Sequence, residues 1–214
     1  MHDQLLGSTQ PVLSISLEPG ESVVAATGEF AWMTDSIQMT AGRAGMSAYQ
    51  AMAGSGTVAF AARLPGTIMS VEVVPGREFM IHRRAFLAGT PGVEISTGFR
   101  QALGAPAPAG AAADEFVLRR IGGAGRAWVE LSGDVVRRDL RPGVSLRTHP
   151  GHLGMSDASV VVQVAEFEQP AGGQAGNDAR QFAVLSGPGS VWLQSMPLLA
   201  APHHRSPVCP ARPS

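Results

Sequence analysis

Three Pro-Gly pairs, each followed by a strand-like run, restrict the fold of this 214-residue chain more than any other feature. The pairs are Pro19-Gly20, Pro75-Gly76 and Pro142-Gly143. Proline presets φ and glycine accepts a positive φ, so each pair is typical of a type II turn between strands. A large apolar residue stands at the same offset after each proline, and these residues are Phe30, Phe86 and Leu153. The regular spacing predicts one hairpin in each unit of a repeated β structure.

A second repeated element is Gly-x-Gly followed by an apolar run. It occupies residues 54–60, 123–129 and 187–193, and the last of these contains Gly187 and Gly189. If the Gly-x-Gly strand begins the unit, two units are complete and the third is divided between the two ends of the chain. A divided unit predicts that the N- and C-terminal strands meet and close a pseudo-threefold arrangement, which leaves no free sheet edge at the join.

Side chains alternate with a period of two along much of the chain, as strands require. For example, Ala127, Val129 and Leu131 alternate with polar or larger side chains. Only residues 43–52 favour a helix, of one or two turns. The sequence therefore predicts an all-β chain that forms a single compact domain of three related lobes.

The domain is expected to span residues 11–199, after a lead at residues 1–10 and before a disordered, Pro-rich tail at 200–214. Its repeat halves are expected near residues 11–40, 54–97, 116–168 and 182–196.

Composition excludes several classes of function. All 16 basic residues are Arg, and without Lys no Schiff base or phosphate-loop lysine is available. A net charge of −1 disfavours a generally basic nucleic-acid or membrane surface. The single cysteine, Cys209, permits neither an intramolecular disulfide nor a Cys-based zinc cluster. The sequence shows no signal-peptide pattern and no apolar run that could span a membrane, so we expect a cytoplasmic protein.

Four longer words resemble those of a known family. They are LEPGESVVAATGEFAWM, RRAFLAGTPGVEI, RPGVSLRTHPGHLGMSDASVVVQV and SGPGSVWLQSMPL. In this order they resemble bacterial, actinobacterial-type members of the altered inheritance of mitochondria protein 24 family, also called the mitochondrial biogenesis family. The resemblance implies an all-β fold related to the double-stranded β-helix and to the trp RNA-binding attenuation protein-like superfamily. It implies no catalytic residues, because none are agreed for the bacterial members.

A cupin-like architecture raises the question of a metal site, for which His82, His149 and His152 are weak candidates. A cupin-type site needs a glutamate soon after its first two histidines, and none follows His152 at that spacing; the nearest acid is Asp157. We therefore expect structural roles for these histidines and no cofactor, metal or catalytic residue.

Adjacent arginines form three pairs. These are Arg83 with Arg84, Arg119 with Arg120, and Arg137 with Arg138. Neighbouring residues of a strand point to opposite faces, so one Arg of each pair could contact an anion, RNA or another subunit. Solvated strand faces are the alternative. Trp128 and Trp192 share one offset after their Gly-x-Gly, where they could lie in a core or at a subunit interface.

The recurring residues are turn formers and core residues rather than titratable groups. The sequence therefore favours a non-enzymatic structural or binding protein, in the form of a homo-oligomeric β scaffold with unknown protein partners. Two alternatives stay open. One is a small-molecule or metal-dependent binding protein or enzyme of cupin-like architecture, and the other is an RNA or anion binder that uses the Arg pairs.

Overall fold

The computed structural model describes residues 1–42, 45–103, 115–166 and 181–198. The tail expected at 200–214 therefore lies outside the described residues. Nearly all regular structure in the described ranges is β-strand, and every strand pair is antiparallel. The prediction of an all-β chain is confirmed. The two helices in these ranges are single 3-10 turns, and neither is long or apolar enough to cross a membrane.

After β1 (His2–Leu6), the strands form three units of six, which we call lobes 1, 2 and 3. Lobe 1 holds β2 (Val12–Leu17), β3 (Ser22–Ala26), the 3-10 turn η1 (Thr27–Glu29), β4 (Phe30–Met33), β5 (Ile37–Ala41), β6 (Met46–Ala51) and β7 (Gly56–Ala61). Lobe 2 holds β8 (Gly66–Val73), β9 (Phe79–His82), β10 (Phe86–Gly89), β11 (Val93–Ala102), β12 (Glu115–Gly123) and β13 (Gly125–Ser132). Lobe 3 holds β14 (Val135–Leu140), β15 (Ser145–Thr148), the 3-10 turn η2 (Pro150–His152), β16 (Leu153–Asp157), β17 (Val161–Glu166), β18 (Gln181–Ser186) and β19 (Gly189–Gln194).

Strand pairing is the same in all three lobes. The sixth strand lies between the first and the third, and the fifth lies between the second and the fourth. In lobe 1, for example, β7 pairs with β2 and β4, while β6 pairs with β3 and β5. The third strand carries a register shift against the sixth at the same place in each lobe. The repeated sequence words therefore correspond to one repeated unit of backbone structure.

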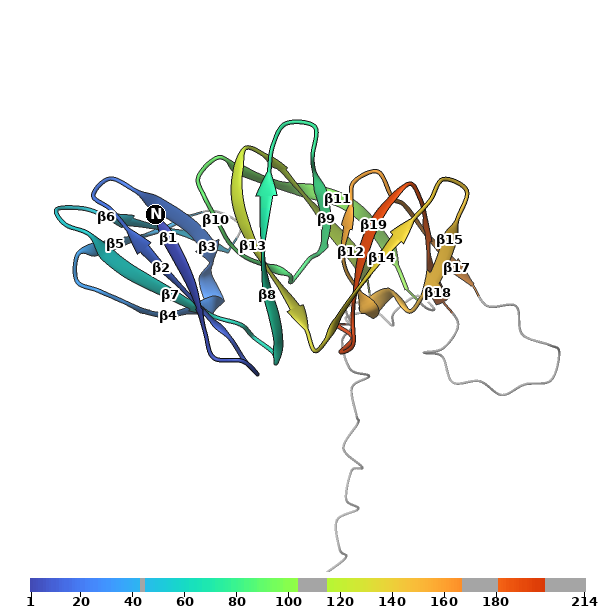
Figure 1. Ribbon diagram of the computed structural model, residues 1–214, viewed down its shortest axis with the longest axis horizontal. Coiled ribbons are helices and arrows are strands. Elements are labelled where there is room, and N and C mark those ends of the chain that lie inside the picture. The colour runs from blue at the N-terminus through green and yellow to red at the C-terminus, as the bar shows by residue number, and fades with distance from the viewer. Residues whose placement is uncertain (43–44, 104–114, 167–180, 199–214) are drawn as a thin grey trace, which may run out of the picture.

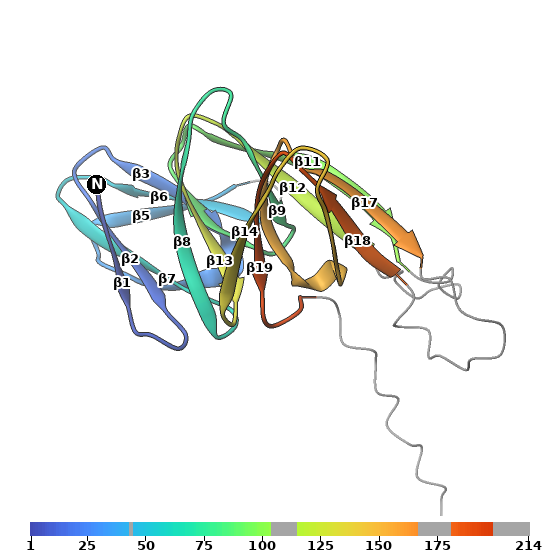
Figure 2. The ribbon, with the colours of Figure 1, turned by 45° about the vertical axis from the view of Figure 1, so that its right-hand side comes forward.

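Successive lobes are joined by one strand pair each, and they lie in a row (Figure 1). The second strand of one lobe pairs with the third strand of the next, as β3–β10 and then as β9–β16. This joining produces two inner sheets of six strands, β5-β6-β3-β10-β13-β8 and β11-β12-β9-β16-β19-β14. The outer sheets are β1-β2-β7-β4 at one end and β15-β18-β17 at the other. Figure 2 shows the same row from a second direction.

Each lobe has its own apolar core between two sheets. Lobe 1 buries Tyr49, Phe60 and the apolar face of β2, to which Trp128 of lobe 2 adds its indole. Phe79 lies in the core of lobe 2, and Phe116, on β12 of lobe 2, adds its ring to the core of lobe 3. Aliphatic side chains at alternate strand positions supply most of the rest, as the period of two predicts.

The expected meeting of the terminal strands is wrong. Among the described strands, β1 pairs only with β2, and β19 pairs only with β14 and β16. The unit begins with the strand before the Pro-Gly turn and ends with the Gly-x-Gly strand, so all three units are complete in sequence order. Spacing alone does not say where a unit begins. The pseudo-threefold closure that followed from a divided unit is accordingly not confirmed.

One local expectation is also corrected. Residues 43–52 were expected to form a helix, but β6 covers Met46–Ala51, where Ser47, Tyr49 and Ala51 point inward at strand spacing. The lead at residues 1–10 contains β1. The turns are as expected, with φ of 86°, 85° and 78° at Gly20, Gly76 and Gly143.

Candidate functional site

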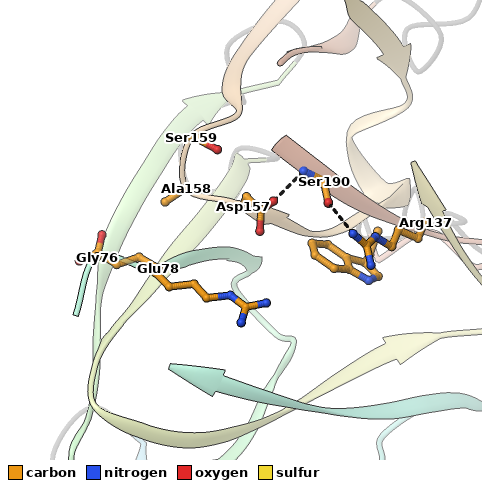
Figure 3. Close-up of a pocket in the computed structure, with 9 residues that line it drawn as sticks. Gly76, Glu78, Arg137, Asp157, Ala158, Ser159 and Ser190 are labelled. Atoms are coloured by element: carbon orange, nitrogen blue, oxygen red, sulfur yellow. Dashed lines mark hydrogen bonds between the residues drawn. The ribbon is translucent and has the colours of Figure 1, made fainter. Parts of the chain in front are cut away.

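A polar cleft of about 520 Å³ opens at the junction between lobes 2 and 3 (Figure 3). Its lining comes from the turn before β9, from β14, from the turn after β16 and from β19. The lining residues are Gly76, Arg77, Glu78, Arg137, Asp157, Ala158, Ser159, Ser190 and Trp192. Four of them were named from the sequence: Gly76 in a Pro-Gly turn, Arg137 as an anion contact, Asp157 as the acid nearest His152, and Trp192 at the offset that it shares with Trp128.

Hydrogen bonds inside the cleft converge on Ser190. Its backbone N–H donates to Asp157 Oδ2 at 2.7 Å, and its hydroxyl donates to Asp139 Oδ1 at 2.6 Å. Arg137 donates to the Ser190 hydroxyl and to Asp139 Oδ1, both at 3.1 Å. The hydrogen bond from Ser190, with Arg137 beside it, holds the pKa of Asp139 below its usual range. The serine hydroxyl is therefore engaged by a carboxylate and an arginine.

Both arginines of the cleft lie over aromatic rings. The Arg137 guanidinium carbon is 5.4 Å from the Trp192 ring centre, and that of Arg77 is 5.6 Å from the Phe79 ring centre. Glu78 pairs with Arg120 at 2.7 Å. Within the described ranges, no carboxylate forms an ion pair with Arg77. Of the two arginines that line the cleft, Arg137 is therefore offset by Asp139, whereas Arg77 is not offset by an ion pair with any described residue.

The hydrogen bond of Asp157 recurs in the other two lobes with different side chains. Thr34 Oγ1 accepts from the Thr57 N–H at 3.0 Å, and Thr90 Oγ1 accepts from the Arg126 N–H at 3.0 Å. Thr34, Thr90 and Asp157 each stand four residues after the first residue of the third strand, and each acceptor holds the N–H that follows the Gly-x-Gly. The carboxylate of Asp157 therefore accepts the backbone hydrogen bond that a threonine hydroxyl accepts in the other two lobes.

The junction between lobes 1 and 2 is covered where the cleft is open. Asp3 of β1 accepts from the Arg126 side chain at 2.8 Å and from Trp128 Nε1 at 3.1 Å. No strand equivalent to β1 pairs with the outer edge of β8 or β14 in the described ranges. Trp128 is buried, whereas Trp192, at the same offset, is half-buried beside the cleft.

Two buried carboxylates meet one arginine at the same junction. Arg63, in the link between lobes 1 and 2, donates from Nε to Glu29, and its backbone N–H donates to Glu130 Oε2 at 2.9 Å. Arg63 Nε lies 3.7 Å from Glu130 Oε1. Burial raises the pKa of Glu130 to about 7, although the Arg63 N–H and guanidinium act in the opposite direction. We call Glu29, Arg63 and Glu130 the carboxylate cluster.

The three candidate histidines have structural contacts and do not form a metal-binding group. Among the residues that the structure describes, no group of three His, Cys, Asp or Glu side chains could hold a metal ion. His149 Nδ1 accepts from the Gly151 N–H at 3.3 Å, and His152 Nδ1 lies 2.7 Å from the Gln194 carbonyl oxygen. His82 is buried, and burial with the nearby Arg83 and Arg84 charges lowers its pKa to about 4.

The arginine pairs are not gathered into one groove. Arg83 and Arg84 follow β9, and Arg119 and Arg120 lie on the neighbouring β12. The third pair, on β14, is at the opposite edge of the same sheet, where Arg137 pairs with Asp139 at 3.0 Å. Arg138 is exposed beside it. The structure therefore brings two pairs to adjacent strands and leaves the third apart.

The residues that the sequence analysis missed come together from distant positions. Asp3 contacts Trp128 across 125 residues of sequence, and Arg63 contacts Glu130 across 67. Asp3, Arg63 and Glu130 lie outside the repeated Gly-x-Gly words, so no local pattern could have identified them. The only available signal was the repeat itself, which makes the positions around Trp128 and Trp192 equivalent.

Comparisons with known proteins agree with the fold. The chain resembles a protein from Streptococcus pyogenes of known crystal structure, with 15% sequence identity and a TM-score of 0.71, over 92% of this chain and 94% of that one. At this identity, the likeness concerns the fold alone. No curated protein sequence matches the chain. The family model described as mitochondrial biogenesis AIM24 matches residues 4–196, and the chain therefore belongs to this family.

Proposed function

We propose that this protein is a non-enzymatic β scaffold that associates with copies of itself. One observation carries the proposal. The position that places Asp157 in the cleft holds a threonine in the other two lobes, where it makes the same hydrogen bond to backbone. The three lobes therefore share the strand pairing and this hydrogen bond. In the cleft, the acceptor of the hydrogen bond is an aspartate instead of a threonine.

The contents of the cleft support the same reading. None of its nine lining residues is His or Cys, and its serine hydroxyl bonds to Asp139. Nucleophilic catalysis requires a general base within hydrogen-bond reach of the nucleophile. Asp139 is mostly exposed and its pKa is lowered, which makes it a weak base.

The two alternatives have less support. A metal-dependent activity needs imidazoles that converge, and His82, buried on β9, forms no metal-binding group with His149 and His152. RNA binding needs a continuous basic surface with aromatic platforms. Two of the Arg pairs lie at neighbouring strands, β9 and β12, and the third lies apart from them on the edge strand β14. Three finer points stay predictions from the sequence. They are the actinobacterial type, membership of the trp RNA-binding attenuation protein-like superfamily, and a cytoplasmic location.

Native mass spectrometry of the full chain, purified without chelator, tests the proposal. We expect a multimer of this chain without a metal or small-molecule adduct, in an amount that grows with protein concentration. A monomer that carries a stoichiometric adduct would contradict the scaffold and support a binding protein or enzyme. The mass of the adduct would then identify the chemistry.

A further inference from the structure

The two internal junctions leave one strand unused at each end of the row. The third strand of a lobe pairs with the second strand of the previous lobe, as β10 does with β3 and β16 with β9. In the described ranges, the outer edge of β4, the third strand of lobe 1, pairs with nothing. The outer edge of β15, the second strand of lobe 3, is likewise unpaired. The outer edges of the fourth strands, β5, β11 and β17, are free in all three lobes of the described ranges, and those of the first strands, β8 and β14, are free in lobes 2 and 3.

The exposed fraction of the first residue in the third strand differs between the junction strands, β10 and β16, and β4, whose outer edge is free. Phe86 and Leu153, in the internal junctions, are 3% and 0% exposed. Phe30, at the same position in lobe 1, is 38% exposed. Two positions further on, Trp32 is 47% exposed, and Met33 beside it is also exposed. An uncharged edge strand with large apolar side chains lacks the usual protection against pairing with another chain.

Backbone hydrogen bonds show which groups of the two strands point outward. The Thr34 N–H donates to the Thr57 carbonyl, toward β7. Since successive residues of a strand direct their N–H and C=O groups to opposite sides, those of Met33 point away from lobe 1. The Val144 carbonyl accepts from the Gly187 N–H, on the β18 side of β15. By the same alternation, Ser145 and Arg147 direct their backbone groups away from lobe 3.

We propose that β15 of one copy of this chain pairs, antiparallel, with β4 of a second copy, in the register of the internal junctions. This inference rests on the proposed self-association and names the surfaces that perform it. The internal registers place Gly89 opposite Val24 and Ser156 opposite Met80. The equivalent positions at the ends of the row place Met33 opposite Arg147, both with outward backbone groups.

Side chains at the two ends are complementary in this register. Trp32, the larger residue, falls opposite the smaller Thr148. Asp35, exposed just after β4, falls opposite Ser145 and diagonal to Arg147, within reach of a long side chain on the same face. The contact joins two different surfaces, so each added copy leaves one β4 and one β15 free. The assembly therefore closes as a ring or grows as a linear array.

Charged substitutions at the opposed residues Met33 and Arg147 test the register. In sedimentation experiments on the full chain over a wide concentration range, we expect Met33→Arg to weaken association about tenfold or more, because it places two like charges opposite each other. Arg147→Glu alone should also weaken association. Met33→Arg combined with Arg147→Glu should restore it, because the opposed charges then attract. The matched control is Met39→Arg, on β5 of the same lobe, at a residue that is 48% exposed.

The outcomes separate this inference from the proposal on which it rests. If the wild-type chain stays monomeric at all concentrations, both fail. If it associates and Met33→Arg behaves like Met39→Arg, or the double variant is not restored, the scaffold survives and the β4–β15 contact is wrong. Circular dichroism checks that each variant is folded.

Cross-linking gives a second measurement that does not depend on a weakened contact. Hydrogen-bonded partners on antiparallel strands have Cα atoms about 5.5 Å apart, a separation that a disulfide can span. A Cys209→Ser chain that carries Met33→Cys and Arg147→Cys should form a ladder of linked copies on oxidation. Chains with only one of these two cysteines should not form it. If no ladder appears while the chain associates, the proposed register is overturned.

Discussion

The two internal junctions have the same backbone and different side chains. Both join one lobe to the next through a short antiparallel pair. At the first junction, Asp3 bonds to Trp128, and the two carboxylates of the carboxylate cluster are buried. At the second, the Trp192 side chain lies beside an open polar cleft under Arg137. Strand pairing thus sets how lobes are arranged, and side chains set how strongly each junction is held.

The largest expected difference between the junctions is at the two tryptophans. We expect Trp128→Ala to lower the free energy of unfolding by about 3–5 kcal/mol, since it removes a large buried side chain from the core of lobe 1. Trp192→Ala should cost less than half as much, because that ring is half-buried and the cleft can admit water. Urea unfolding, followed by circular dichroism, measures both. Equal losses would show that the second junction is as tightly packed as the first.

Ionisation of Glu130 should make the first junction sensitive to pH. Its pKa rises from 4.5 to about 7 on folding, so the folded state binds more protons between these values. Stability from this group therefore falls as the pH rises from 4.5 to 7, by up to about 3 kcal/mol. Glu130→Gln should remove this dependence. The measurement is the free energy of unfolding of both chains across that pH range.

His82 changes stability in the opposite direction and supplies the control. Its pKa falls from 6.5 to about 4 on folding, so stability rises with pH between these values. The two slopes oppose each other in the wild-type chain. We expect Glu130→Gln to leave a stability that rises with pH, and His82→Gln to leave one that falls. A wild-type slope unchanged by Glu130→Gln would mean that folding does not raise the pKa of Glu130.

A smaller effect is expected at Asp3, which covers the first junction from β1. Asp3→Ala leaves the buried Trp128 N–H without its acceptor, and such a loss costs about 1–3 kcal/mol. The matched change at the second junction is Asp139→Ala, which removes an exposed acceptor from Ser190 and Arg137. We expect little change in its thermal unfolding. Equal shifts in the two variants would remove the distinction between a covered and an open junction.

The sequence predicted the strands and turns well, because these depend on neighbouring residues. The Pro-Gly turns, the alternation in β13 and the apolar position shared by Phe30, Phe86 and Leu153 are all local. The boundaries of the repeated units were not predictable in the same way. Whether the Gly-x-Gly strand begins or ends a unit depends on which strand it pairs with, and spacing is the same in both cases.

The candidate site was predicted only in part. Arg137 lies in the cleft, but its partners Asp139 and Ser190 come from two strands that meet only in the folded chain. The predicted helix at residues 43–52 failed for a related reason. Pairing with β3 outweighs the helix propensity of these residues. The pairing buries Tyr49, whose ring centre lies 5.1 Å from that of Phe60.

The smallest expected effect compares one hydrogen bond in lobes 1 and 2. Thr90→Val removes the acceptor of the Arg126 N–H and should cost about 1 kcal/mol. Thr34→Val removes the equivalent acceptor of the Thr57 N–H, but Thr34 is exposed, so water can replace the hydroxyl in a separate chain. Pairing of β4 with a second copy would bury this site. The cost of Thr34→Val should then approach that of Thr90→Val in unfolding experiments at high protein concentration. A cost that stays small at every concentration would contradict the burial of β4 in an assembly.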